Sequence, residues 1–268
     1  MTNLLKRGTS GLFYSVLFIS AILYSRESYI FLISLFGFIS IWEFFKLLKF
    51  KNSLVYIIFL CLIYLSYFSF DSSLLIHILL VLSLSGSLQL LVNLFLKKKN
   101  YPSNSIHKFD ICFRYLLLSF TFLILIPFVN EEYKESIIMS LVIFIWVNDS
   151  FAFFVGKNLG KRKLFKSVSP KKTIEGFLGG VIFSVITAIL LSYSSYFSNF
   201  LSLTNLIVVS LIASIFGTIG DLVESKFKRQ VNVKDSGTIM PGHGGLLDRL
   251  DSLLFVAPFV YLYIHYLI

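Results

Sequence analysis

The sequence has few charged residues and few cysteines, and it lacks a P-loop. Only 14% of its 268 residues are Asp, Glu, Lys or Arg, whereas soluble domains average about 25%. The two cysteines, Cys61 and Cys112, lie inside apolar runs without a CxxC spacing, which excludes a disulfide framework and predicts packing roles. Neither GxxxxGKS nor GxxxxGKT occurs in the chain. The low charge excludes an ordinary soluble domain.

Long apolar runs fill most of the chain. Hydrophobic residues make up 56% of the sequence, and no run alternates with the period of a barrel strand, so the runs predict an all-α integral membrane protein. No small-residue cleavage site follows the first bases, so the first run is expected to be a retained helix. The nine candidate spans are 10–25, 28–46, 53–70, 73–96, 111–129, 136–156, 176–198, 202–222 and 247–267.

Lysine and arginine concentrate on one side of these predicted spans. With the N-terminus inside, all of the 24 Lys and Arg residues except Arg26 and Lys134 fall in inside segments. This asymmetry predicts a cytoplasmic N-terminus, an odd number of spans, and functional loops on the cytoplasmic face of the inner membrane. The net charge of +10 also suits an anionic partner, although topology alone predicts the same excess.

A few polar residues lie within the predicted spans. Asp149 lies about 20 Å along an outside-to-inside helix, where a carboxylate is costly unless it is paired, protonated or facing water. We expect a functional role for it, with a structural ion pair to a loop lysine as the alternative. Glu43 lies near an inner helix end, where function and snorkelling to the interface are both open. Gln89 and Asn93 are expected to bond neighbouring helices.

The segment 157–176 is too polar to span and carries seven bases. Such a segment suits an anionic lipid surface or a phosphate, although positive loops are expected on the inside face in any case. Ser169 and the proline after it mark a turn, and Thr173 is placed to cap the next helix. With Lys172 and Glu175 close by, we predict that this loop binds substrate.

The segment 220–251 holds the densest group of charges, between two long apolar runs. Asp221 is predicted to end the eighth span, and Asp248 and Asp251 share one face at the start of the ninth. Neighbouring carboxylates repel unless a cation lies between them. Three aspartates at facing helix ends suit Mg²⁺, which substrate phosphates complete. The alternative is a network of ion pairs with Arg249 and the lysines.

Other polar residues share the helical face of Asp221. Glu224 and Ser225 follow it at spacings of three and four. Lys228 follows Glu224 by four, so these two are expected to form at least a surface ion pair.

A glycine-rich turn, Pro241-Gly-His-Gly-Gly245, leads directly into the ninth span. Glycine permits positive φ and close approach of the backbone to a ligand, and its N–H groups can cradle an anion. His243 is expected either to bond a phosphate or to support the turn.

These segments resemble the phosphatidate cytidylyltransferase (CDP-diacylglycerol synthase) family. The main signature is Ser225-Lys-Phe-Lys-Arg-x4-Lys234-Asp235-x-Gly237, then Pro241-x-His243-Gly-Gly-Leu-x-Asp248-Arg249-Leu-Asp251. The segments Ser169-Pro-x-Lys172-Thr173-x-Glu175-Gly176 and Asp149-Ser-x-Ala152 are similar to the family as well. The sequence departs from the family at Met240, a conservative change, and at Phe151, where the family usually has glycine.

The resemblance implies that CTP and phosphatidic acid give CDP-diacylglycerol and pyrophosphate, with Mg²⁺ as cofactor and a second cation left open. It places the catalytic helices and loops in 131–268, after N-terminal helices in 1–130, within one polytopic domain. The implied catalytic residues are Asp221, Asp248, Asp251, Lys226, Arg249 and His243. The implied substrate-binding residues are Ser169, Lys172, Thr173, Glu175, Ser225, Lys228, Arg229, Lys234, Asp235, Gly244 and Gly245. The implied metal ligands are Asp221, Asp248, Asp251 and Asp149.

Membrane lipid is an expected partner and nucleic acid is not; a homodimer is left open. Two other functions remain as alternatives. A CTP-dependent kinase of a membrane lipid alcohol would use similar residues but would need a general base for a neutral hydroxyl. An ion or phosphate transporter would also use intramembrane acids, but transporters often contain two related halves, and no internal repeat is found in this sequence.

Overall fold

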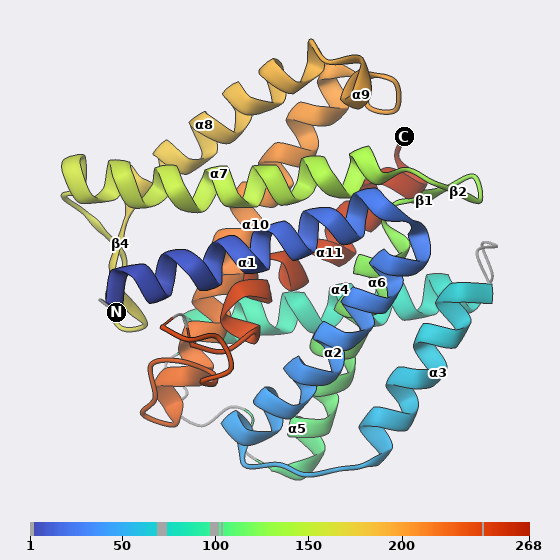
Figure 1. The fold of residues 1–268 in the computed structure, drawn as a ribbon. Helices are drawn as coiled ribbons and strands as arrows, with labels where there is room; N and C mark the ends of the chain where they lie inside the picture. Colours follow the sequence, from blue (N-terminus) through green and yellow to red (C-terminus); the bar gives the residue numbers. More distant parts are fainter. Residues whose placement is uncertain (1–2, 69–73, 97–101, 103, 243) are drawn as a thin grey trace.

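The computed structural model describes residues 3–68, 74–96, 102, 104–242 and 244–268, without the side chains of residues 3–7. The chain is built almost entirely of helices, which are connected by short loops and two small hairpins (Figure 1). The helices are α1 Asn3–Tyr24, α2 Arg26–Leu48, α3 Leu54–Phe68, α4 Leu74–Phe95, α5 Ser105–Ile111, α6 Leu118–Leu125, α7 Glu135–Leu159, α8 Ile174–Ser192, α9 Ser195–Ser198, α10 Leu203–Gln230 and α11 Leu247–Tyr266. A π-helical segment, Cys112–Leu117, joins α5 to α6.

The apolar segments predicted from the sequence fall mainly on helices, as far as the described residues extend, although 111–129 ends in the strand Phe128–Val129 and 176–198 is divided between α8 and α9. Within the described residues, five helices are long and apolar enough to cross a membrane: α2, α4, α7, α8 and α10. The apolar helices Gly8–Tyr24 and Leu54–Phe68 are shorter than this criterion requires. The protein is therefore a mainly helical, multi-pass membrane protein, whereas the number of nine spans and their orientation stay predictions.

The ends of two helices differ from the sequence-based prediction. Helix α10 does not end at Asp221 but continues to Gln230, because an ion pair between Glu224 and Lys228 compensates the charges of its last turns. Helix α8 ends at Ser192, earlier than predicted, and the short helix α9 follows.

The polar loop between α7 and α8 forms a hairpin of β3 Lys163–Phe165 and β4 Ser169–Thr173, antiparallel with Phe165 opposite Ser169. A second hairpin, β1 Phe128–Val129 and β2 Glu132–Tyr133, joins α6 to α7. An extended backbone replaces helix in both places, so the expectation of an all-α chain holds for the apolar segments and not for these connections.

The connections gather at two ends of the molecule (Figure 1). The start of α1, the β3–β4 hairpin and the loop 231–246 lie toward one end. The β1–β2 hairpin, α9 and the end of α11 lie toward the other. The loop between α10 and α11 is held against α1, where the Ser10 hydroxyl donates to the Pro241 carbonyl oxygen over 3.0 Å. The polar segments that were predicted to carry function are thus together at one end.

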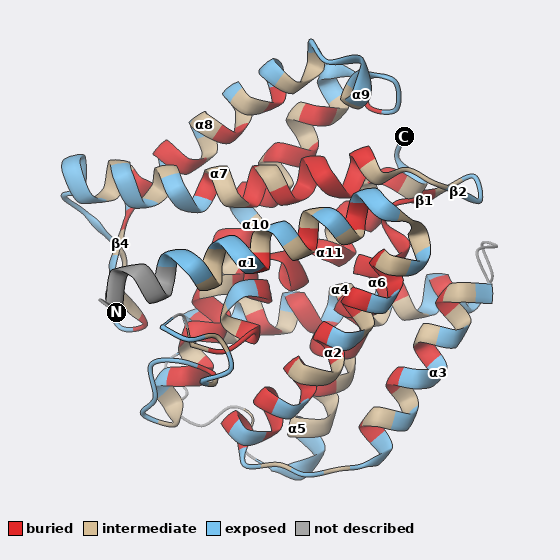
Figure 2. Cartoon of the chain, in the orientation of Figure 1, coloured by how far each residue is buried: buried red, intermediate tan, exposed pale blue. Residues whose placement is uncertain are grey.

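Buried residues concentrate along α6, α10 and α11, whereas α3 and α8 carry more exposed surface (Figure 2). Large apolar side chains on the outer face of α8 are exposed, as expected for contact with lipid. Those of α8 are Leu178, Ile182, Ile186, Ile189 and Leu190. Two of these buried helices, α10 and α11, carry the charged residues of the C-terminal segment.

Glycines allow the helices around this segment to pack closely. A Cβ at Gly220 of α10 would lie 2.6 Å from the Phe255 Cβ and 2.7 Å from the Asp251 carbonyl oxygen of α11. Only glycine therefore permits this separation, which brings the end of α10 beside the start of α11. On α7, Phe151 takes the place of the family's usual glycine and stacks on Phe183 of α8, with 3.8 Å between the ring centroids.

Candidate active site

A cavity of about 540 Å³ lies between α7, the β3–β4 hairpin, α8, α10 and the start of α11. Its lining includes all four aspartates predicted to bind metal, together with several of the predicted bases. The lining residues are Asn148, Asp149, Ala152, Phe153, Gly156, Lys157, Leu164, Lys171, Lys172, Thr173, Phe177, Thr218, Asp221, Lys228, Asp235, Asp248, Arg249 and Asp251. The cavity is where segments far apart in the sequence meet.

Two lysines hold two of the aspartates in this cavity. Lys172 Nζ of the hairpin lies 2.6 Å from Asp221 Oδ2. Lys228 Nζ lies 2.6 Å from Asp248 Oδ1 and 3.1 Å from Glu224 Oε2, and all three of these side chains are at least nine-tenths buried. Lys228 and Glu224, which were predicted to pair at the surface, are therefore buried. Lys228 also pairs with Asp248 of α11. A neighbouring lysine favours the charged form of a carboxylate, whereas burial opposes it.

Backbone amides complete the environment of Asp248. The Ser236 and Gly245 N–H groups each donate to Asp248 Oδ2 over 2.8 Å. The glycine-rich turn supplies this geometry, since Gly242 and Gly244 have φ values of 78° and 97°, which side chains rarely tolerate. Within the turn, the Gly245 amide therefore binds a carboxylate of this chain, and the role of the turn toward a substrate anion stays a prediction.

Asp149 and Asp251 lie deeper along the helices. Asp149 is exposed and lines the cavity. Its carboxylate therefore avoids the free-energy cost of burial in the middle of an apolar helix. Asp251 is buried, and its Oδ1 accepts the Ser252 N–H over 2.7 Å. No ion pair to a lysine is found for Asp149 among the described residues, so the alternative of a structural ion pair is not supported there.

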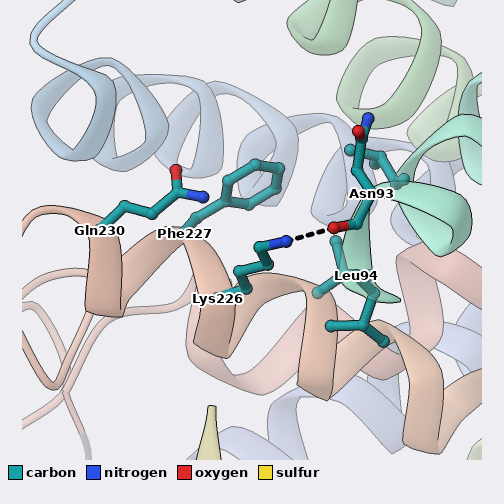
Figure 3. A pocket seen from close by; sticks show the side chains of 7 residues that line it. Asn93, Leu94, Lys226, Phe227 and Gln230 are labelled. Atoms are coloured by element: carbon teal, nitrogen blue, oxygen red, sulfur yellow. Dashed lines mark hydrogen bonds between the residues drawn. The ribbon is translucent and has the colours of Figure 1, made fainter. Parts of the chain in front are cut away.

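Lys226 does not line the cavity and points instead toward Asn93 of α4 (Figure 3). Its Nζ donates to the carbonyl oxygens of Asn93 and, over 3.0 Å, Leu96 at the end of α4. Unpaired carbonyl groups at a helix C-terminus favour a cation. The structure thus gives Lys226 a contact that joins α10 to α4 and does not bring it to the predicted catalytic group.

The placement of Lys226 leads to a direct comparison of two lysines. We expect Lys172→Met to lower turnover by about 10²-fold, the scale of losing one charge-stabilising group. Lys226→Met should lower it by less than about tenfold, since Lys226 does not line the cavity. Initial rates of the purified variants, normalised to folded protein, measure the difference. Equal losses of turnover in both variants would indicate that Lys226 takes part in catalysis after all.

Other predicted residues support the walls of the cavity. Thr173 caps α8 as predicted, accepting the Gly176 N–H over 3.1 Å, and it also lines the cavity. Glu175 accepts the Lys161 and Arg162 N–H groups, which closes the start of the hairpin. These contacts are structural, and of the predicted hairpin residues only Lys172 and Thr173 line the cavity.

The remaining predicted residues lie around the cavity. The Ser225 hydroxyl donates to Asp221 Oδ1 over 3.2 Å, and Arg229 donates to the carbonyl oxygens of Val168 and Val233. Ser169, Ser225, Arg229, Lys234, Gly244 and Gly245 do not line it. His243 lies outside the described residues. Asp235 and Arg249 line the cavity and are exposed.

Two polar side chains outside the cavity were also predicted from the sequence. Gln89 accepts a hydrogen bond from Arg114 of the π-helical segment, which confirms its predicted bond to a neighbouring helix. Glu43 is fully buried and does not reach toward an interface, so snorkelling was the wrong alternative.

The sequence reasoning missed several residues of the cavity. Lys157 and Lys171 were counted as part of a basic loop, yet both line the cavity. Asn148, beside the predicted Asp149, lines it too, and its Nδ2 lies 3.5 Å from Thr218 Oγ1. Asn148 could have been found because it is a polar residue inside an apolar span, next to Asp149, and polar residues inside spans are commonly functional. Apolar side chains such as Phe153 gave no such signal.

The donors in the cavity are suited to a hard divalent cation. Mg²⁺ is commonly bound by one or two carboxylates together with substrate phosphates and water, and Asp149, Asp221, Asp248 and Asp251 line one cavity. Asn148 Oδ1 is buried there without a hydrogen-bond partner among the described residues. Among all described residues, no group of three or more His, Cys, Asp or Glu side chains is arranged to hold a metal ion by itself. The residues therefore fit a cation that the substrate helps to bind, not a preformed protein cage.

Comparisons with known proteins agree on one family. Residues 5–267 match the sequence profile described as the cytidylyltransferase family. The chain is 34% identical to phosphatidate cytidylyltransferase of Bacillus subtilis over 269 aligned positions, covering 97% of each protein. It is 52% identical to that of Staphylococcus haemolyticus over 114 positions, covering 42% of this chain and 43% of that protein. The Staphylococcus aureus protein is 49% identical over 121 positions, covering 45% and 46%.

Proposed function

The chain belongs to the cytidylyltransferase family, and we propose that it transfers CMP from CTP to phosphatidic acid, giving CDP-diacylglycerol and pyrophosphate. The observation that carries this proposal is the cavity in which Asp221 and Lys172 meet Asp248 and Lys228. It combines carboxylates for a cation with bases for phosphates at one end of a membrane protein. The Bacillus subtilis relative, which aligns with 97% of this chain at 34% identity, carries the same activity in its name.

The reaction joins two polyanions, so the main difficulty is electrostatic repulsion. The phosphate of phosphatidic acid is ionised near neutral pH, and its oxygen attacks the α-phosphorus of CTP without needing a strong general base. The bond between the α- and β-phosphates breaks, and pyrophosphate leaves with that electron pair. Catalysis then rests on positioning and on charges held in place before the reaction.

The bases of the cavity supply those charges. Lys172 and Lys228 already hold carboxylates, and they can pass to phosphate oxygens when substrate binds. Lys157, Lys171 and Arg249 also line the cavity, and we assign them to the triphosphate and the lipid phosphate.

Asp221 and Asp248 would hold Mg²⁺, with Asp149 and Asp251 close by in the same cavity. When bound there, the ion would withdraw charge from the phosphate oxygens of CTP. A second cation is compatible with four aspartates in one cavity. When Lys172 and Lys228 bind phosphate oxygens of the substrates, Asp221 and Asp248 would lose their lysine partners and could bind the cation.

The lipid substrate explains the apolar part of the lining. Ala152, Phe153, Leu164 and Phe177 lie beside the charged residues, and Phe153 is exposed at the outer side of α7. We place the diacylglycerol part of phosphatidic acid on this side, with its chains in the bilayer. CTP is soluble, so the cavity would open to the cytoplasm at the inner membrane, with the N-terminus on the same side.

The experiment follows the products of labelled CTP. Purified protein in detergent is incubated with phosphatidic acid and CTP labelled in the cytosine, with and without Mg²⁺. We expect label in the lipid fraction and release of pyrophosphate, both dependent on Mg²⁺. Formation of CDP and a phosphorylated lipid when diacylglycerol replaces phosphatidic acid would instead indicate the kinase. If neither lipid product forms while labelled phosphate or ions cross proteoliposomes, the protein is a transporter.

A further inference from the structure

Glu43 of α2 is a fully buried carboxylate that the proposed reaction does not use. It accepts the Leu246 N–H at Oε1 over 3.1 Å and the Leu247 N–H at Oε2 over 2.8 Å. The Ser236 hydroxyl donates to Oε2 over 3.3 Å. One side chain of the second helix thus binds both ends of the loop 236–247, about two hundred residues further along the chain.

The start of α11 depends on this contact. Leu246 occupies the N-cap position and has no side-chain cap, although the first N–H groups of any helix need acceptors from elsewhere. Glu43 supplies the missing acceptors from another helix, and a carboxylate is favoured at the positive end of a helix. The carboxylate therefore acts as a cap that the sequence around α11 does not contain.

The same loop holds Asp248 with its neighbouring amides. Ser236 donates through its N–H to Asp248 and through its hydroxyl to Glu43. Gly245 N–H goes to Asp248, whereas the next two amides go to Glu43. The two carboxylates share one set of donors, so a shift of the loop away from Glu43 would also move the donors of Asp248.

The packing around Glu43 leaves little room for another arrangement. A Cβ on Gly245 would lie 2.6 Å from Glu43 Oε2, and one on Gly237 would lie 2.9 Å from Glu43 Cδ. Both glycines therefore pack directly against the Glu43 carboxylate, and a larger residue at either position would clash with it. Glu43 itself does not line the cavity, so it touches neither substrate in this arrangement.

We propose that Glu43 is a positioning residue, which fixes the loop 236–247 so that its amides hold the Asp248 carboxylate toward the cavity. The kinetic consequence rests on the proposed function, since Asp248 is assigned there to the reaction. The structural consequence does not, because it concerns only the order of the loop. The two consequences can be measured separately.

The test is Glu43→Gln, which keeps the size of the side chain but replaces one acceptor oxygen with a donor. We expect amides of the loop 236–247 to exchange hydrogen at least about tenfold faster, with no change in α7 or α8. We also expect kcat per folded molecule to fall by about 10–100-fold, as for partners that orient a ligand. The KM for phosphatidic acid should stay within about twofold of the wild-type value.

Glu27→Gln is the matched control, because Glu27 is an exposed glutamate on the same helix. It should leave exchange and turnover unchanged. Unchanged loop exchange in Glu43→Gln would overturn the proposal, as would normal turnover of its folded fraction with only a lower yield. If the wild type makes no CDP-diacylglycerol, the proposed function fails, and the exchange measurement still decides the role of Glu43.

Ser236→Ala provides a milder variant if Glu43→Gln does not fold. It removes one hydrogen bond to Glu43 and keeps the Ser236 N–H that donates to Asp248. Faster exchange at Leu246 and Leu247 together with a smaller loss of kcat would support the proposal. No change in either quantity would contradict it.

Discussion

Asp248→Asn is expected to reduce the formation of CDP-diacylglycerol by at least about 10²-fold while the protein still folds. Asp248 is the carboxylate on which the largest number of cavity contacts meet: Lys228 on one oxygen and two amides on the other. The asparagine oxygen can still accept the amides, so the loop keeps its anchor. The variant loses the negative charge that is proposed to bind Mg²⁺, so the rate of CDP-diacylglycerol formation should no longer depend on the Mg²⁺ concentration.

The measurement is the initial rate as a function of Mg²⁺ concentration, together with size-exclusion behaviour of the purified variant. Asp110→Asn is the matched control, since it removes the charge of an aspartate paired with Arg114 outside the cavity. It should keep near-normal turnover. An Asp248→Asn variant with wild-type rate and Mg²⁺ response would show that Asp248 is not a metal ligand.

Lys228→Met has the second large expected effect, this time on both stability and activity. Lys228 lies between Glu224 and Asp248, and the exposed fractions of the three side chains are 9%, 1% and 6%. Removing the cation leaves Glu224 and Asp248 without an ionic partner, although two amides still bind Asp248, and breaking a buried ion pair costs about 3–5 kcal/mol of stability. Turnover should fall as well, because a base assigned to the phosphates is lost.

Thermal unfolding of Lys228→Met in detergent checks the first effect, and the rate of its folded fraction below the transition checks the second. Lys166→Met is the matched control, since Lys166 is an exposed lysine between β3 and β4 that does not line the cavity. A Tm for Lys228→Met equal to that of the control would mean that the buried carboxylates bind protons or water without cost.

The helical periodicity of the sequence contained more than the first reading of it used. Asp221, Ser225 and Lys228 recur at spacings of three and four, and the structure places them on the side of α10 that faces the cavity or supports it. Lys226 follows Asp221 by five, which turns it about 140° away around the helix. Its direction away from the side of Asp221 could therefore have been predicted, whereas its position beside α4 could not.

Contacts between distant segments were the part that no local pattern could supply. Glu43 and the loop that it binds are separated by 193 to 204 residues. The hairpin β3–β4 brings Lys172 to Asp221 from another connection. Such pairs depend on how the helices pack, and the periodicity of one segment does not contain that information.

The sequence by itself determined that the protein is helical and embedded in a membrane, because apolar runs of this length leave the backbone no other way to satisfy its hydrogen bonds. It also determined which acids and bases are unusual, since charges within apolar runs are costly. Only the tertiary structure decided which of them meet. Close packing of α10 on α11 at Gly220 and the cap from Glu43 set those distances, and they arise from side chains that are neighbours in space alone.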